Sequence, residues 1–119
     1  MSLRLASVAF IGALAVSTAT FAEIPTVELM IQNRVFTVQE LKLPADTKIK
    51  LVVHNQDSIP AEFESYDLSR EVVVPGHNSV IIYIGPLSPG RYNFFNDFNH
   101  AAQGWVVVAE PAPTTHSSN

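Results

Sequence analysis

The stretch Gly90–Val108, GRYNFFNDFNHAAQGWVVV, indicates how this chain folds. Two runs rich in aromatic and β-branched residues, RYNFF and GWVVV, flank a short polar segment, NDFNHAAQG. Such runs are typical of β-strands, so we predict two strands that hold a polar loop at one rim of a β fold. Rigid strands that present polar side chains are a common way to build a binding site. The polar residues of this loop are Asn96, Asp97, Asn99, His100 and Gln103.

The earlier part of the chain shows the same strand character. Apolar and polar residues alternate, which predicts strands with one buried face. The segments concerned are Pro25–Gln32, Val35–Leu43, Lys48–His54, Arg70–Val74 and Ser79–Ile84. Asn55–Leu68 breaks the alternation and is expected to hold a turn or a short helix. Short strands separated by turn residues predict an all-β fold, and we expect a Greek-key β-sandwich.

The two ends of the chain differ from the middle. Residues 1–22 combine a short positive start, an apolar run over Leu5–Ala19 and small residues before Glu23. This pattern predicts a cleaved secretory signal peptide. The alternative is an uncleaved membrane anchor, for which the apolar run is short. Residues 23–110 are then one domain, and residues 111–119, rich in Pro, Thr and Ser, are a predicted disordered tail. We expect an exported, soluble protein that does not insert into the membrane after the leader is removed.

The composition excludes several classes of function. The net charge is −4 at pH 7, and an acidic chain of this size is a poor ligand for nucleic acid. The sequence contains no cysteine. That absence excludes a thiolate nucleophile, a cysteine-held iron–sulfur cluster and a cysteine-ligated blue-copper centre.

Two groups of side chains are candidates for a metal site. In the polar loop, Asp97 and His100 lie three residues apart and could turn toward one ion or one proton. The alternative for this pair is a turn aspartate beside a solvated histidine.

The second group contains four acidic residues within ten positions, with Arg70 as the one basic residue among them. Clustered carboxylates repel one another, and a hard cation such as calcium, magnesium, manganese or ferric iron would compensate them. The alternative is a solvated acidic rim. The four residues are Glu62, Glu64, Asp67 and Glu71.

The strings VVHNQDSIPAEFES, LSREVVVPGHNSVIIYIGPLSPGRYNFF and GWVVVAE make the chain resemble cupredoxin-like domains. The AEFES, SRE and FFNDF strings resemble in particular the small, exported, EfeO-type proteins that accompany bacterial iron permeases. Blue-copper members of the family carry a Tyr-x-Phe-x-Cys run followed by His and Met. Here Asn96 stands at the Cys position, Asn99 at the His and Gln103 near the Met, while the first copper His falls at or beside Glu62.

The resemblance implies that the loop of Glu62 and the loop of Asp97 meet at one rim. It therefore implies a metal site of Glu62, Asp97 and His100, with Glu64 and Glu71 nearby. Relatives carry the loop histidine directly after the DF pair, where this chain has Asn99. Whether His100 or Asn99 faces the site stays open at the level of sequence.

The resemblance also implies a function. The protein would be a periplasmic component of a ferrous-iron uptake system that binds an iron or copper ion. It would pass the ion to a membrane iron permease, together with other periplasmic components. Two alternatives are a ferroxidase, in which the bound metal takes an electron from Fe(II), and a structural adaptor that only docks a partner protein.

Overall fold

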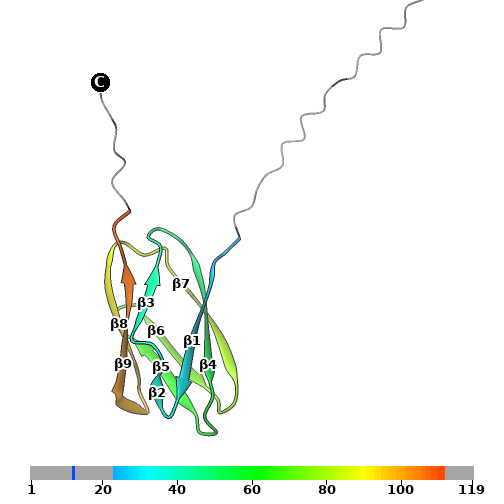
Figure 1. Cartoon of the computed structure of the whole chain (residues 1–119), viewed down its shortest axis with the longest axis vertical. Coiled ribbons are helices and arrows are strands. Elements are labelled where there is room, and N and C mark those ends of the chain that lie inside the picture. The colour runs from blue at the N-terminus through cyan, green and yellow to red at the C-terminus, as the bar shows by residue number, and fades with distance from the viewer. Residues whose placement is uncertain (1–11, 13–22, 112–119) are drawn as a thin grey trace, which may run out of the picture.

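The computed structural model describes residue 12 and residues 23–111 and contains two β-sheets packed face to face (Figure 1). The predicted signal peptide therefore lies outside the described residues apart from Gly12, and so do residues 112–119 of the predicted tail. The strands are β1 (Thr26–Gln32), β2 (Val35–Phe36), β3 (Glu40–Leu43), β4 (Ile49–Asn55), β5 (Ala61–Ser65), β6 (Arg70–Val74), β7 (Ser79–Ile84), β8 (Gly90–Asn96) and β9 (Asn99–Val108).

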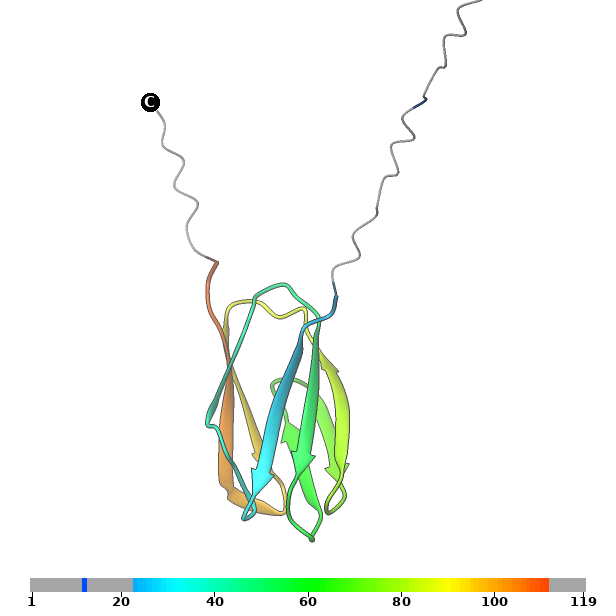
Figure 2. The ribbon, with the colours of Figure 1, turned by 45° about the vertical axis from the view of Figure 1, so that its right-hand side comes forward.

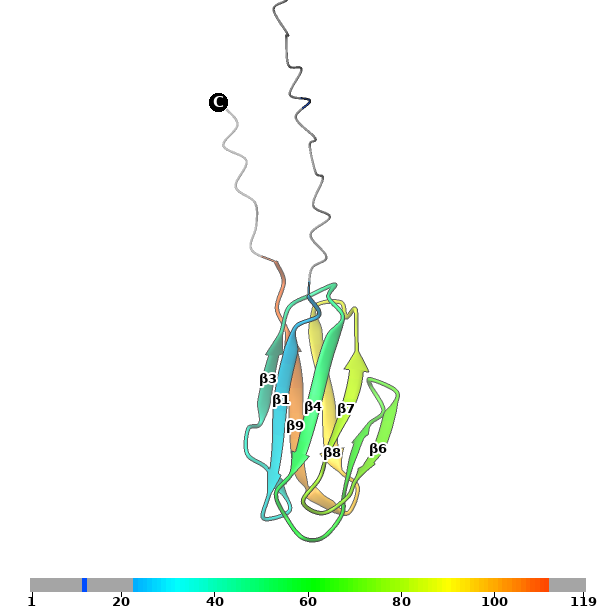
Figure 3. The same cartoon turned by 90° about the vertical axis from the view of Figure 1, so that its right-hand side faces the viewer.

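One sheet has the strand order β2-β1-β4-β7 and the other has the order β3-β9-β8-β5-β6. Strands β1 and β4 are parallel, as are β3 and β9, and the other paired strands are antiparallel. The chain changes sheets after β2, β3, β4, β6 and β7, and Figure 3 looks onto the face of the sheet that contains β1, β4 and β7. The predicted all-β Greek-key sandwich is confirmed. Over the described part of the chain, we find no helix with the length and apolar character needed to cross a membrane.

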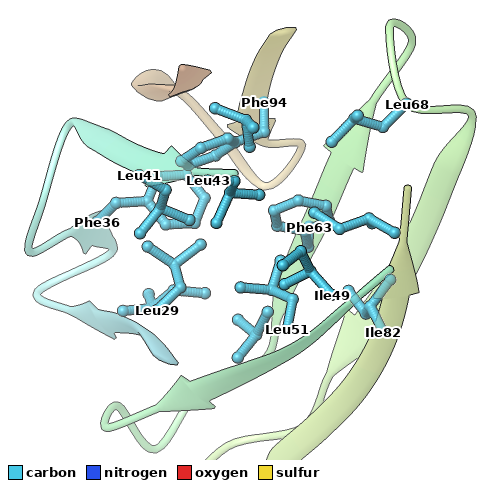
Figure 4. Packing of buried hydrophobic residues seen from close by; sticks show 14 of the residues in the cluster. Leu29, Phe36, Leu41, Leu43, Ile49, Leu51, Phe63, Leu68, Ile82 and Phe94 are labelled. Atoms are coloured by element: carbon cyan, nitrogen blue, oxygen red, sulfur yellow. The ribbon is translucent and has the colours of Figure 1, made fainter. Parts of the chain in front are cut away.

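The core lies between the two sheets and includes the ring of Phe94 (Figure 4). Phe36 packs edge-on against this ring with centroids 4.9 Å apart, and Phe63 stacks on it at 5.4 Å. The Phe94 ring also lies against Gly104, its partner on β9. A Cβ atom at Gly104 would lie 2.3 Å from the Phe94 ring, so only glycine leaves room for the ring at this position.

Two expectations about strand boundaries were wrong. The segment Val35–Leu43 is not one strand, because β2 and β3 belong to different sheets and residues 37–39 cross between them. The segment Asn55–Leu68 contains strand β5, not only a turn or a helix. The sequence AEFES does alternate, and its inward residues are Ala61 and Phe63. The strand has only these two apolar residues, so its alternation is too short to stand out in the sequence.

The polar loop is also shorter than expected. A turn at Asp97 and Phe98 joins β8 to β9, which begins at Asn99. Most of the segment NDFNHAAQG is therefore strand. The pairing of β8 and β9 shifts register between Phe95 and Asn96, which is an irregularity of the kind that redirects side chains next to functional sites.

Four turns gather at the end of the sandwich that is lowest in Figures 1 and 2. The Asp57 carboxylate accepts hydrogen bonds from the backbone N–H groups of Asn33 and Arg34, and the Asp57 carbonyl accepts one from His77. The Arg34 guanidinium donates to the carbonyl of Phe98. These bonds connect the turns to one another, so this rim is held in place by backbone contacts as well as by the core.

We predict that Gly104→Ala lowers the free energy of unfolding by about 1–3 kcal/mol, because the new methyl group would overlap the Phe94 ring. Urea denaturation measures the change. In the Phe94→Leu background the same substitution should cost less, since the overlapping ring atoms are gone. An equal cost in both backgrounds would show that the ring contact is not the cause.

Candidate metal centre

Three carboxylates converge on the outer side of the five-stranded sheet. Glu62 and Glu64 are two residues apart on β5, and Phe63 between them points into the core, so both glutamates project from the opposite face. Asp97 comes from the turn between β8 and β9. One carboxylate oxygen from each residue lies within 4.8 Å of the others, and no other such group of three occurs in the described part of the chain. We call these three residues the acidic trio.

Two hydrogen bonds donated by backbone N–H groups bring the trio together. The N–H of Asp97 donates to the carbonyl of Glu62 at 3.0 Å, and the N–H of Glu62 donates to Asn96 Oδ1 at 3.1 Å. Because these bonds are made by the backbone and a buried amide, they fix the spacing of β5 and the turn whatever the state of the carboxylates. The predicted meeting of the Glu62 and Asp97 segments is thus present in the structure.

The negative charge of the trio is increased by a neighbouring carboxylate. Glu71 is the cross-strand partner of Glu64 and adds a fourth carboxylate. A hydrogen bond with Glu71 is the largest cause that raises the pKa of Glu62 to about 7, followed by burial and by repulsion from the neighbouring carboxylates. The pKa of Glu64 is raised as well, first by burial and then by repulsion from Glu71 and Asp97.

Arg70 does not neutralise this group, although it lies next to Glu71 in sequence. Its guanidinium donates instead to the backbone carbonyls of Leu68, Ser69 and Tyr83. The fourth acidic residue of the sequence pattern, Asp67, accepts a hydrogen bond from the N–H of Asn93 at 2.8 Å. Asp67 therefore has a structural partner and is not part of the trio.

The glutamates of the trio are buried rather than solvated. Glu62 is 6% exposed and Glu64 is 8% exposed. Glu64 Oε2 is the one buried side-chain nitrogen or oxygen atom of the described residues that lacks a hydrogen-bond partner. Buried polar atoms are almost always paired in folded proteins, so an unpaired carboxylate oxygen needs an explanation such as an ion.

His100 lies beside the trio but is not one of its three members. Its Nε2 is 2.8 Å from Asp97 Oδ1, while its side chain is 72% exposed. The imidazole also packs edge-on against Phe95, with ring centroids 5.6 Å apart. The structure therefore brings together all five residues of the predicted site, with His100 in contact with Asp97, and Glu71 in contact with Glu62 and Glu64.

Comparison with known proteins places this architecture in a family. The family described as the cupredoxin-like domain matches residues 4–108. The chain belongs to the cupredoxin-like domain family. It is a member without cysteine.

A related sequence is known from Rickettsia prowazekii (strain Madrid E). This uncharacterized protein is 42% identical to our cupredoxin-like chain over 83 residues, which cover 69% of the chain and 66% of the relative. The match thus spans slightly less than two thirds of the relative's length.

Several solved structures share the fold. Auracyanin B has a TM-score of 0.64 at 17% identity, covering 76% of this chain and 94% of its own. Auracyanin A, a "blue" copper protein from Chloroflexus aurantiacus, has a TM-score of 0.61 at 14% identity, covering 72% and 99%. The metal-binding domain of the Cu(I)-exporting ATPase CopA from Streptococcus pneumoniae D39 has a TM-score of 0.62 at 13% identity, covering 71% and 85%. At these identities the likeness shows the fold alone.

Two of the positions that the family resemblance aligns with blue-copper ligands, Asn96 and Asn99, hold hydrogen-bonded amides in this cupredoxin-like domain, while Glu62, at or beside the position of the first copper His, belongs to the acidic trio. Asn96 is 2% exposed, accepts hydrogen bonds from the N–H groups of Glu62 and Phe98, and donates to the carbonyl of Arg34. Asn99 donates to the same carbonyl. These two amides therefore have structural partners, whereas the acidic trio lies on the outer face of the sheet.

We predict that the stability of the metal-free protein falls as pH rises from about 4.5 to about 7. The folded state holds the Glu62 proton more tightly than the unfolded state, since its pKa is raised from 4.5 to about 7 on folding. The folded state therefore binds more protons in this range, and stability decreases with pH. Melting temperatures measured across the range should fall for the wild type and change less for Glu62→Gln.

The matched control is Glu110→Gln, which alters an exposed carboxylate outside the strands. This variant should show the same pH dependence as the wild type. If Glu62→Gln also follows the wild type, the Glu62 carboxyl group does not carry the effect.

Proposed function

We propose that this cupredoxin-like protein binds a metal cation through the acidic trio. The observation that carries the proposal is the unpaired, buried Glu64 Oε2, which points to an absent partner within a group of three carboxylates. A cation among Glu62, Glu64 and Asp97 would supply that partner and would relieve the repulsion that, after the Glu71 hydrogen bond and burial, adds to the raised pKa of Glu62 and, after burial, to that of Glu64. The alternative, in which these carboxylates form only a solvated acidic rim, explains the structure less well because both glutamates are buried.

The donor atoms narrow the choice of ion. The trio offers only carboxylate oxygens, which are hard ligands that suit iron and manganese better than Cu(I). Among the cations that such oxygen ligands suit, we propose iron as the main cargo because the AEFES, SRE and FFNDF strings resemble those of EfeO-type proteins. Copper, as Cu(II), is the second candidate, because Cu(II) accepts oxygen donors and the similarly folded auracyanin A is a copper protein.

We further propose that the protein works outside the cytoplasm in a ferrous-iron uptake system and hands its ion to a membrane iron permease. Support comes from the leader-like residues 1–22 and from the AEFES, SRE and FFNDF strings shared with the EfeO-type proteins. The Asp97 side chain is 38% exposed, which also suits transfer because a partner can approach the trio from that side. Turnover separates a carrier from a ferroxidase, since a carrier binds its ion stoichiometrically and an oxidase consumes excess Fe(II).

We predict that Mn(II), or Fe(II) without oxygen, raises the melting temperature of the wild-type protein. A metal that binds only the folded state adds about 2.7 kcal/mol to the free energy of unfolding at a free concentration about 100 times Kd. Glu62→Gln and Asp97→Asn should abolish the shift, because each removes one charged ligand. Without metal, both variants should be more stable than the wild type at neutral pH, since each relieves carboxylate repulsion.

Glu110→Gln serves again as the matched control and should retain the whole metal-induced shift. If Glu62→Gln and Asp97→Asn retain it too, the trio is not the site. That result would favour the adaptor function, in which the sandwich only docks a partner.

We propose a positioning role for His100 within this site. Its contact with Asp97 orients the carboxylate toward the two glutamates, and no metal–nitrogen bond is required. We predict that the electron paramagnetic resonance spectrum of bound Cu(II) shows no nitrogen coupling that depends on His100. His100→Gln, which keeps a donor, should retain more metal affinity than His100→Ala.

The spectrum decides between the two roles of this histidine. An imidazole coupling that is present in the wild type and lost in His100→Gln would make His100 a direct ligand. Equal affinities of the two variants, with no such coupling in the wild type, would leave His100 without a role in the site.

A further inference from the structure

A second feature lies next to the acidic trio on the same face of the sheet. It is a surface hollow of about 280 Å³. We call it the aromatic hollow. The residues that line it are Tyr66, Asn93, Phe95, His100 and Gln103. They come from the turn after β5 and from the two strands of the β8–β9 hairpin, so three segments of the fold meet there.

Three rings form the apolar part of the hollow. Phe95 is half-buried, and Tyr66 is tilted against it with centroids 5.5 Å apart and an interplanar angle of 57°. His100 meets Phe95 edge-on, at 77°. Tyr66 is 77% exposed, so most of this large aromatic side chain is accessible to a ligand. The three rings thus pack in a row through Phe95 and form the apolar wall of the hollow.

The two amides complete the hollow on its polar side. Asn93 Nδ2 lies 3.5 Å from Gln103 Oε1 and donates to the carbonyl of Gly104 at 3.2 Å. Gln103 Nε2 donates to the carbonyl of His100 at 3.3 Å. The amides are therefore held in place by backbone carbonyls, and the hollow has a rigid polar edge.

The electrostatic potential around the hollow is negative. Phe95 is the cross-strand partner of Glu64, and His100 contacts Asp97, so the acidic trio borders the hollow on one side. The faces of aromatic rings are also negative, and they attract cations. An anionic ligand would be repelled by both, whereas an organic cation would be attracted by both.

These observations favour an organic cation over a bare metal ion in the hollow itself. Carbon rings offer no lone pairs, and the one imidazole among them is already in contact with Asp97. Ring faces instead bind alkylammonium groups, whose charge is spread over methyl and methylene groups. A hydroxyl or carbonyl carried by the ligand could pair with the amides of Asn93 and Gln103.

We propose that the aromatic hollow binds a small organic ammonium ion, with Tyr66 and Phe95 against the ammonium group and Glu64 and Asp97 supplying the negative potential. The aromatic hollow is a different binding site from the acidic trio, and the proposal for it does not require that the trio binds a metal. Because the two sites share a border, the two cations should weaken each other's binding.

The test compares choline with dimethylbutanol, its neutral isostere in which carbon replaces the charged nitrogen. Isothermal titration calorimetry of the metal-free, full-length protein should detect choline and not the isostere. Equal binding of the two, or binding of neither, would overturn the proposal, because the charge would then contribute nothing.

Variants locate the binding. Tyr66→Leu should weaken choline binding about fivefold or more, as expected for loss of a cation–π contact. Tyr66 is exposed, so this variant should keep the wild-type fold, which circular dichroism checks. The matched control is Phe98→Leu, which removes an exposed aromatic ring that does not line the hollow. An equal effect of the two substitutions would place binding elsewhere.

A third ligand tests whether the ammonium group belongs to a free cationic solute or to a phosphate-bearing lipid headgroup. Phosphocholine carries the same ammonium group together with a phosphate, which the carboxylates should repel. Weaker binding of phosphocholine than of choline supports a free cationic solute. Tighter binding of phosphocholine, or of phosphatidylcholine vesicles, would overturn the proposal in favour of a phosphate-bearing headgroup.

Discussion

The candidate site depends on two hydrogen bonds that join the start of β5 to the end of β8. The Asp97 N–H bonds to the Glu62 carbonyl, and the Glu62 N–H bonds to the buried amide of Asn96. Without them, a turn and a strand bearing three carboxylates would move apart, since like charges at close range repel. Backbone hydrogen bonds do not depend on those charges, so they hold the acidic groups together against the repulsion.

The energy that opposes this repulsion comes from elsewhere in the sandwich. Phe63 lies between the two glutamates in sequence and stacks on Phe94 in the core, so the apolar burial on one face of β5 offsets the cost of holding two buried carboxyl groups on the other face. Gly104 permits that stacking because it leaves room for the Phe94 ring. The core and the acidic trio are therefore two faces of the same strands, and a change in one affects the other.

The fold also shows how one architecture can carry different sites. In this cupredoxin-like chain the inner rim, around Asn96 and Asn99, is filled by amides bonded to the Arg34 carbonyl. The polar chemistry lies on the outer face of the five-stranded sheet, where the trio and the aromatic hollow share a border at Phe95 and His100. Function in such folds depends on the site and cannot be taken from the architecture alone.

The sequence by itself determined the all-β class, most of the strands and the acidic residues of the candidate site, because alternation and charge are local properties of the chain. It did not identify β5, since this strand has only two apolar residues and its alternation is therefore very short. Only the tertiary structure decided which carboxylates meet, that Asp67 pairs with the backbone, and that His100 contacts Asp97. Those facts depend on strand register and on the irregularity at Asn96, which arise from pairing between segments distant in sequence.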